Sequence, residues 1–121
     1  MTKTVLSVDD SPSIREMMAF ALEPHGYTVV QAEDGNDGLR QMSANNIDLV
    51  ITDLNMPNMN GIEMTRAIRA DTRFDGVPIV LLTTEGQREK MIEGKAAGAA
   101  GWIVKPFDEQ KICSIVKKMI G

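Results

Sequence analysis

Six acidic, hydroxyl or basic residues follow directly after short apolar runs of this sequence. They are Asp9 and Asp10, Asp53, Thr83 and Thr84, and Lys105. Three carboxylates lying together would repel one another and raise one another's pKa, and a hard divalent cation such as Mg²⁺ would relieve that repulsion. A neighbouring lysine could hold a phosphoryl or carboxylate oxygen. Such groups suit phosphoryl transfer, in which a carboxylate is the nucleophile and fixed charges neutralise the transferred group.

These residues can meet only if regular elements bring distant parts of the chain together. Short runs rich in β-branched residues alternate with segments whose apolar residues recur at helical spacing, which predicts alternating strands and helices. We expect strands at residues 4–8, 27–31, 47–52, 77–82 and 100–104. We expect helices at residues 12–23, 35–44, 61–70, 86–97 and 108–119.

The alternation also predicts how the strands are arranged. Strands joined by helices run parallel, and right-handed crossovers place helices on both faces of the sheet. We therefore expect an α/β fold, a doubly wound parallel sheet of five strands with five helices, in a flavodoxin-like architecture. The carboxyl ends of all strands then meet at one edge, where such sheets bind ligands, and the six polar residues converge there.

The helix expected at 86–97 is the weakest of the five, because its apolar face is thin and Gly94 interrupts it. Two explanations of Gly94 stay open. The helix could be a movable element of low stability, or the glycine could simply allow close packing.

Composition limits the classes of protein that fit. The 121 residues are 43% hydrophobic and 25% charged, which is typical of a folded protein, and we expect a single domain over residues 1–121 without an output domain. A net charge of −4 without a basic block disfavours nucleic-acid binding, and the longest apolar stretch, 96–104, is too short to span a membrane. The single cysteine, Cys113, excludes an internal disulfide. We therefore expect a cytoplasmic monomer that binds neither nucleic acid nor membrane.

Each candidate residue also has a purely structural explanation. Asp10 could cap a helix, and Asp53 could be a turn residue. Thr83 could be an ordinary residue at a strand end, and Lys105 an exposed lysine. Taken one at a time, these explanations are the simpler ones. Taken together, they do not explain why complementary charges follow strands that end at the same edge.

Four motifs resemble those of a known family. They are Val8-Asp9-Asp10-Ser11, Asp53-Leu54-Asn55-Met56-Pro57, Leu82-Thr83-Thr84 and Lys105-Pro106-Phe107. Together they resemble response-regulator receiver domains over the whole chain, and most closely the single-domain receivers of chemotaxis. The resemblance implies the strand order 2-1-3-4-5. It also implies a phosphoacceptor signalling domain and not an enzyme, since such a domain catalyses only its own phosphorylation and dephosphorylation.

The resemblance assigns roles to the acidic residues. Asp53 would be the phosphoacceptor, which attacks the phosphohistidine of a partner histidine kinase in a Mg²⁺-dependent reaction. Asp10 would bind Mg²⁺ directly and Asp9 mainly through water, while Asp53 and the backbone carbonyl of Asn55 would supply further ligands. Asn55 and Glu85 stand at positions that tune the lifetime of the phosphorylated state, and both are of the type associated with fast loss of phosphate. We therefore expect a short-lived phosphorylated state, with a phosphatase as a further candidate partner.

The resemblance also implies a switch. Lys105 would pair with a phosphoryl oxygen and precede a cis bond to Pro106, and Thr83 would turn inward to hydrogen-bond the phosphoryl group. An aromatic residue of the fifth strand would fill the space that Thr83 leaves. Here it is Trp102, where chemotaxis relatives commonly carry Tyr, and its larger indole is expected to make the inward rotation incomplete. Plain packing is an equal alternative for Trp102. The fourth helix, fifth strand and fifth helix would form the surface that binds the target.

We therefore expect a stand-alone response regulator that binds a flagellar motor switch protein. A phosphate sink and a phosphorelay intermediate are alternatives within the same family. A small Mg²⁺-dependent phosphatase is less favoured, because such enzymes need a second acid where this chain has Asn55. A flavodoxin is disfavoured because Asp9 and Asp10 would repel the FMN phosphate, and the intact acidic residues argue against a receiver that serves only for docking.

Overall fold

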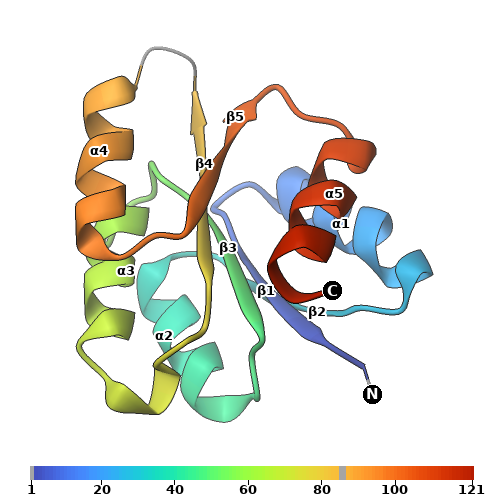
Figure 1. The fold of residues 1–121 in the computed structure, drawn as a ribbon, viewed down its shortest axis with the longest axis horizontal. Coiled ribbons are helices and arrows are strands. Elements are labelled where there is room, and N and C mark those ends of the chain that lie inside the picture. Colours follow the sequence, from blue (N-terminus) through green and yellow to red (C-terminus); the bar gives the residue numbers. More distant parts are fainter. Residues whose placement is uncertain (1, 85–86) are drawn as a thin grey trace.

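The protein is described by a computed structural model that covers residues 2–84 and 87–121. Within these residues five strands alternate with five α-helices, as predicted (Figure 1). The strands are β1 (Thr4–Val8), β2 (Thr28–Ala32), β3 (Leu49–Asp53), β4 (Ile79–Thr84) and β5 (Gly101–Lys105). The helices are α1 (Pro12–Leu22), α2 (Gly35–Ala44), α3 (Gly61–Arg69), α4 (Arg88–Ala97) and α5 (Glu109–Ile120). Two short 3₁₀ helices were not predicted: Glu23–His25, which begins at the last residue of the helix expected at 12–23, and Thr72–Phe74.

The sheet is parallel throughout, with the strand order β2-β1-β3-β4-β5, which confirms the predicted topology. Helices α1 and α5 pack together on one face of the sheet, and α2, α3 and α4 follow one another on the other face (Figure 1). The strand order reverses between β1 and β3. In a doubly wound sheet, the crevice at the carboxyl ends of such a strand pair is the preferred place for a ligand.

Side-chain caps fix where the helices begin. The Ser11 Oγ accepts a hydrogen bond of 3.4 Å from the Ile14 N–H, and Pro12 occupies the first turn of α1. Asn60 and Glu63 cap the start of α3 reciprocally, through hydrogen bonds of 2.8 and 2.9 Å. Each such cap contributes about 1 kcal/mol. The caps set the path of the chain just after β1 and β3, and so help to position the acidic residues that end those strands.

Four strands end later than predicted. Strand β2 ends at Ala32, and the other three end on candidate residues: β3 at Asp53, β4 at Thr84 and β5 at Lys105. Strand β4 also begins two residues late, because Pro78 has no N–H to give to the sheet. The Pro78 carbonyl accepts a hydrogen bond of 3.0 Å from the Val50 N–H. The remaining predicted bounds of the described elements match or differ by one or two residues. The later strand ends place Asp53, Thr83, Thr84 and Lys105 on strands and not in loops.

The core lies on both faces of the sheet. Under α1 and α5 it includes Leu22, Ile51 and Val116, and on the opposite face it includes Leu6 and Met64. The apolar residues of β4 are fully buried, which agrees with the prediction of a central strand covered on both faces. Among the described residues, no helix is both long enough and apolar enough to cross a membrane.

Close packing accounts for Gly94. This glycine is buried where α4 crosses β4, and a Cβ at this position would overlap the side chain of Leu81. The same Cβ would lie 3.9 Å from Ile62 of α3. Of the two explanations that the sequence leaves open, the structure therefore supports the packing one.

Candidate functional site

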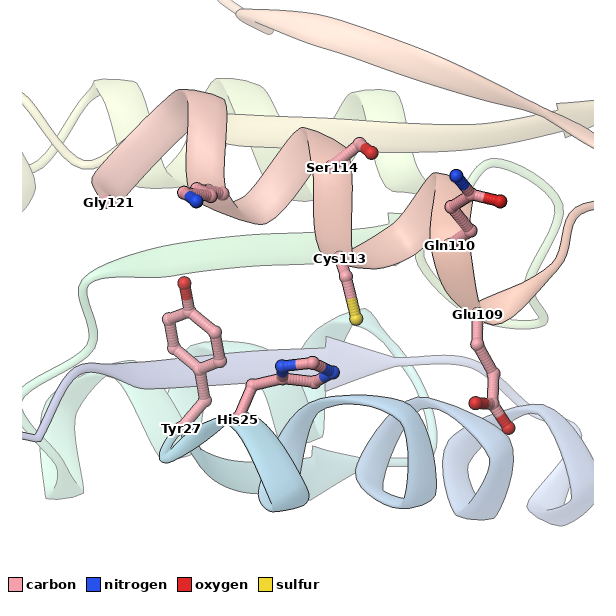
Figure 2. A pocket seen from close by; sticks show the side chains of 8 residues that line it. His25, Tyr27, Glu109, Gln110, Cys113, Ser114 and Gly121 are labelled. Atoms are coloured by element: carbon pink, nitrogen blue, oxygen red, sulfur yellow. The ribbon is translucent and has the colours of Figure 1, made fainter.

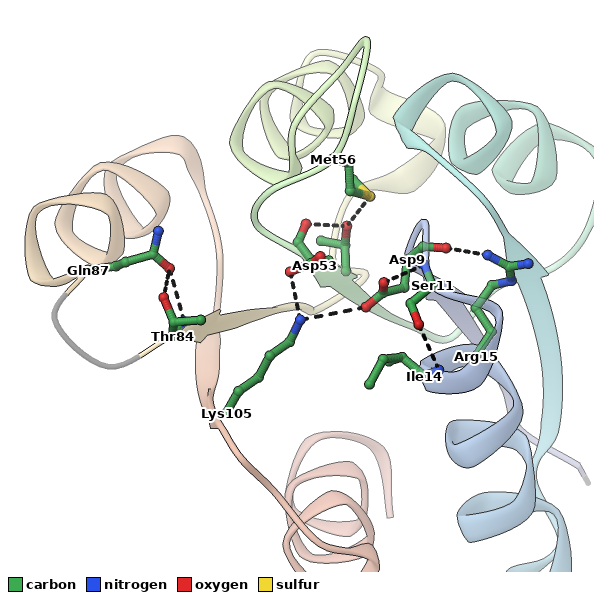
Figure 3. A network of polar contacts seen from close by, with 10 residues as sticks. Asp9, Ser11, Ile14, Arg15, Asp53, Met56, Thr84, Gln87 and Lys105 are labelled. Atoms are coloured by element: carbon green, nitrogen blue, oxygen red, sulfur yellow. Dashed lines mark hydrogen bonds and ion pairs between the residues drawn. The ribbon is translucent and has the colours of Figure 1, made fainter.

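The carboxyl ends of β1, β3 and β5 bring charged residues from both ends of the chain together (Figure 3). Carboxylate oxygens of Asp9, Asp10 and Asp53 all lie within 4.8 Å of one another. Asp9 and Asp53 are buried, at 1% and 6% exposure, whereas Asp10 is exposed. The predicted convergence of the three carboxylates at one sheet edge therefore agrees with the structure, and the cluster opens to solvent on the side of Asp10.

The ammonium of Lys105 completes this group. Its Nζ lies 3.2 Å from Asp53 Oδ1 and 3.9 Å from Asp9 Oδ2 (Figure 3). The Lys105–Pro106 peptide bond is cis, as the resemblance implies. One cation thus stands against two buried carboxylates, and it offsets only part of their mutual repulsion.

The surroundings of Asp9 disfavour its charged form. Burial raises the pKa of its carboxyl above the usual range, and the charges of Asp53 and Asp10 raise it further. A hydrogen bond of 2.9 Å from the Ser11 N–H to Asp9 Oδ1 and the charge of Lys105 act in the opposite direction. The other oxygen, Asp9 Oδ2, is buried and accepts no hydrogen bond among the described residues.

A buried carboxylate oxygen that accepts no hydrogen bond, within an acidic cluster, fits the chemistry of a bound cation. The donor set consists only of oxygens, it is strongly anionic, and the exposed Asp10 leaves room for water molecules on the ion. Mg²⁺ prefers such sites, in which a few carboxylates and several waters complete its coordination. The residues therefore fit a hard divalent cation.

Backbone hydrogen bonds fix the loop that follows β3. The Leu54 N–H donates to the Leu82 carbonyl (3.0 Å), which continues the contact between β3 and β4 beyond Asp53. Asn55 follows with an exposed side chain. The Gly61 N–H then donates to the Leu54 carbonyl (3.0 Å) and closes the loop. Asn55 thus stands two residues after Asp53 on this loop, whereas Glu85 lies outside the described residues.

Thr83 is placed differently from the charged residues. Its side chain is 1% exposed, and its hydroxyl donates to the thioether of Met91 on α4, with 3.7 Å between Oγ1 and Sδ. The next residue, Thr84, contacts Gln87: both its N–H (2.9 Å) and its hydroxyl (2.8 Å) donate to the Gln87 Oε1 (Figure 3). The end of β4 is thus tied to the start of α4, and not to the carboxylates.

Trp102 lies on β5 opposite Leu81 and is 39% exposed. It borders a groove of about 560 Å³ at the surface between α4 and β5. The groove is lined by Arg88, Met91, Ile92, Lys95, Ala96 and Trp102. A second groove, of about 400 Å³, continues from Trp102 to α5 along Ile115 and Lys118. The surface expected to bind a target therefore has an apolar floor and basic edges.

A further pocket, of about 630 Å³, lies away from the acidic cluster (Figure 2). It lies between the end of α1 and α5, where His25 and Tyr27 face Cys113. The Cys113 thiol donates to the Ala21 carbonyl (3.4 Å), and burial together with Glu109 raises its pKa. This pocket is larger than the Trp102 groove, but its lining includes neither Lys105 nor any of the three clustered aspartates.

Sequence reasoning missed Arg15 and Met91. The Arg15 guanidinium donates to the backbone carbonyl of Asp9, and its Nε donates to the Gln31 side chain at 3.3 Å, so it holds the turn that carries the cluster. A cation in the first turns of a helix opposes the helix dipole, and this was the available signal. For Met91 no comparable signal exists, because its contact depends on how α4 packs.

Comparisons with known proteins agree with this geometry. The profile of the response regulator receiver domain matches residues 5–117. The chain is 37% identical to the chemotaxis protein CheY of Pseudomonas aeruginosa, over 95% of this chain and 94% of that protein. It is 38% identical to the chemotaxis protein CheY1 of Helicobacter pylori, over 97% and 96%. It is also 33% identical to the protein PilH of P. aeruginosa, over 97% of each.

Solved structures give the same result. The chemotaxis response regulator CheY4 of Vibrio cholerae superposes with a TM-score of 0.94 at 41% identity, over 99% of this chain and all of that one. A putative response regulator from Chloroflexus aurantiacus superposes with a TM-score of 0.93 at 32% identity, over 98% of each chain. The family match and these structures cover nearly the whole chain, including the residues of the acidic cluster and Lys105. The chain belongs to the response regulator receiver domain family.

Proposed function

We propose that Asp53 accepts a phosphoryl group from the phosphohistidine of a histidine kinase. The observation that carries this proposal is the position of the Lys105 ammonium, 3.2 Å from Asp53 Oδ1 at the edge of the acidic cluster. In the reaction a carboxylate oxygen of Asp53 attacks phosphorus, the P–N bond breaks, and the histidine departs as the neutral imidazole after protonation. An aspartyl phosphate is formed and no oxidant or reductant is needed.

Four residues prepare Asp53 for this attack. Asp9, Asp10 and the backbone carbonyl of Asn55 would hold Mg²⁺ together with Asp53 itself. When bound, Mg²⁺ would neutralise charge on the transferred phosphoryl group. Lys105 would stabilise another of its oxygens, from a position already fixed by ion pairs to two carboxylates.

Phosphorylation would be reported through Thr83 and Trp102. The new group adds about −1.5 to −2 charge and strong acceptor oxygens, which outcompete the thioether that now accepts from Thr83. Thr83 turns toward the phosphoryl group, and Trp102 moves into the space that it leaves. The surface of α4, β5 and α5, with its grooves around Trp102, then binds the target.

The output that we favour is bacterial chemotaxis, by binding to the flagellar motor switch. Two of the relatives are named chemotaxis proteins. The resemblance of the motifs also makes Asn55 a residue of the chemotaxis type. The name PilH of a third relative does not mention chemotaxis, so a phosphate sink and a phosphorelay intermediate are kept as alternatives. The proposal also includes a cytoplasmic monomer, one domain over residues 1–121, and a short-lived phosphorylated state tuned by Asn55 and Glu85.

Beryllofluoride, which imitates a phosphoryl group on a carboxylate, tests the proposal. We expect it to bind in the presence of Mg²⁺ and to change the fluorescence of Trp102, the single tryptophan. Asp53→Ala should abolish both effects. An N-terminal peptide of a flagellar motor switch protein should then bind more tightly to the activated form. Activation without peptide binding would favour a sink or relay, and failure of beryllofluoride and of a small phosphodonor to modify Asp53 would refute the phosphoacceptor role.

A further inference from the structure

The hydroxyl of Thr83 has an unusual partner. Its oxygen is on a side chain that is 1% exposed, so water is a poor alternative, and its hydrogen-bond acceptor is the Met91 sulfur at 3.7 Å. A thioether is a weak acceptor compared with a carbonyl or carboxylate oxygen. The contact therefore gives the buried hydroxyl a hydrogen-bond partner, but a weak one. A stronger acceptor within reach would replace the sulfur.

Met91 also belongs to the surface around Trp102. It is half-buried on α4 and lines the groove of about 560 Å³ together with Trp102. One side chain thus contacts the end of β4 with its sulfur and contributes to the groove. Methionine is unbranched and flexible, so it can change its packing when one of its contacts is lost.

We propose that Met91 is a positioning residue that couples the orientation of Thr83 to the groove around Trp102. In the unphosphorylated protein its sulfur holds the Thr83 hydroxyl toward α4. When Thr83 turns to an acceptor on Asp53, the sulfur loses its donor and Met91 repacks against the groove. This inference rests on the proposed function of Asp53 and Thr83, and adds the residue through which the change passes to α4.

The strength of the contact sets the size of the expected effect. The net contribution of an intramolecular hydrogen bond is small, and a thioether acceptor makes it smaller still. Met91→Leu keeps the volume and helix propensity of the side chain but removes the sulfur. The substitution releases Thr83, so the protein should bind beryllofluoride about two- to threefold more tightly.

The coupling is tested by a double-mutant cycle measured by calorimetry with Mg²⁺ and beryllofluoride, which does not depend on Trp102 fluorescence. Met91→Leu should tighten binding in the wild-type background. In a Thr83→Val background, which lacks the hydroxyl, the same substitution should leave the affinity unchanged. Met17→Leu on α1 is the matched control for replacing a half-buried helical methionine. It should leave the affinity for beryllofluoride unchanged in both backgrounds.

A direct readout comes from the methyl resonances of ¹³C-methyl methionine, with the Met91 signal assigned by its loss in Met91→Leu. We expect this signal to shift in Thr83→Val and on addition of beryllofluoride to the wild type. The coupling would be overturned if Met91→Leu changed the affinity for beryllofluoride equally in both backgrounds. It would also be overturned if the Met91 methyl resonance did not shift in Thr83→Val. If the wild type neither binds beryllofluoride nor accepts a phosphoryl group from a small phosphodonor, the phosphoacceptor proposal itself fails, so the two failures are distinguishable.

Discussion

The ammonium of Lys105 lies 3.2 Å from Asp53 Oδ1, although their strands β5 and β3 are separated by β4 in the sheet. Lys105 pairs in register with Thr84, the last residue of β4, so its side chain passes the end of that strand to reach the carboxylate. The contact therefore depends on the lengths of three strands. It places a cation where the incoming phosphoryl oxygens of the proposed reaction would arrive.

Removal of this cation should weaken binding of the phosphoryl mimic. We expect Lys105→Met, which keeps the aliphatic stem, to lower the affinity for beryllofluoride in Mg²⁺ by at least about tenfold, because a charge-assisted hydrogen bond is lost. Isothermal titration calorimetry measures the loss. The matched control is Lys111→Met on α5, which is exposed and distant from the carboxylates and should bind as the wild type does. Equal affinities for all three proteins would contradict the role of Lys105.

The buried carboxylate of Asp9 should cost stability when no metal is bound. Asp9→Asn removes the charge of an oxygen that has no hydrogen-bond partner among the described residues, and we expect it to raise the free energy of unfolding by about 1–3 kcal/mol in EDTA. The gain should shrink as the pH falls. The pKa of Asp9 is raised in the folded state, so the penalty is present above that pKa and disappears as the carboxyl takes up a proton.

Urea denaturation with and without Mg²⁺ measures this effect. Saturating Mg²⁺ should stabilise the wild type more than Asp9→Asn, because a bound cation would offset the charge of the buried Asp9 carboxylate. Asp10→Asn is the control: its carboxylate is exposed, so its gain in EDTA should be smaller. A metal-free Asp9→Asn protein that is less stable than the wild type would show that the carboxylate serves a structural contact instead.

The convergence of Asp9, Asp53 and Lys105 could be predicted from the sequence for a simple physical reason. Parallel strands joined by helices place all their carboxyl ends at one edge, so polar residues that follow apolar runs must meet there. The neighbours of each strand could not be predicted in this way, because spacing does not reveal strand order. That order came from the resemblance of the motifs to a known family.

The contacts of α4 were beyond sequence reasoning. Its apolar periodicity is weak, so the sequence did not indicate that Met91 would lie against Thr83 or that Gly94 would lie against Leu81. Both contacts depend on how closely the helix approaches β4, which tertiary packing decides. The contact of Gln87 could not be predicted either. This residue stands just before α4, but its side chain accepts a hydrogen bond from Thr84 and does not cap the helix.

The packing of Gly94 can be tested by adding one methyl group. Alanine favours a helix by about 1 kcal/mol over glycine, but its Cβ would overlap the buried Leu81 side chain. We expect the overlap to dominate, so Gly94→Ala should lower the free energy of unfolding by about 1–2 kcal/mol in urea denaturation. Leu81→Val should cost less in the Gly94→Ala background than in the wild type, because it removes the overlap.

The control for this pair is Lys95→Ala, an exposed change in the next position of α4, which should alter stability by less than about 0.5 kcal/mol. A Gly94→Ala protein more stable than the wild type would mean that α4 shifts freely away from β4. The glycine would then mark a movable helix, the other explanation that the sequence allowed.

Trp102 should report how far the switch moves. It is 39% exposed and borders two grooves, so acrylamide can reach the indole in the unphosphorylated protein. If Trp102 turns inward when Thr83 leaves α4, beryllofluoride should lower the acrylamide quenching constant. Because the indole is large, we expect its inward rotation to be incomplete and the decrease to be partial. Asp53→Ala gives the baseline, since it should show no decrease. A quenching constant that stays at this baseline, in a protein shown by calorimetry to bind beryllofluoride, would assign Trp102 to packing and leave the repacking of Met91 as the route to the groove.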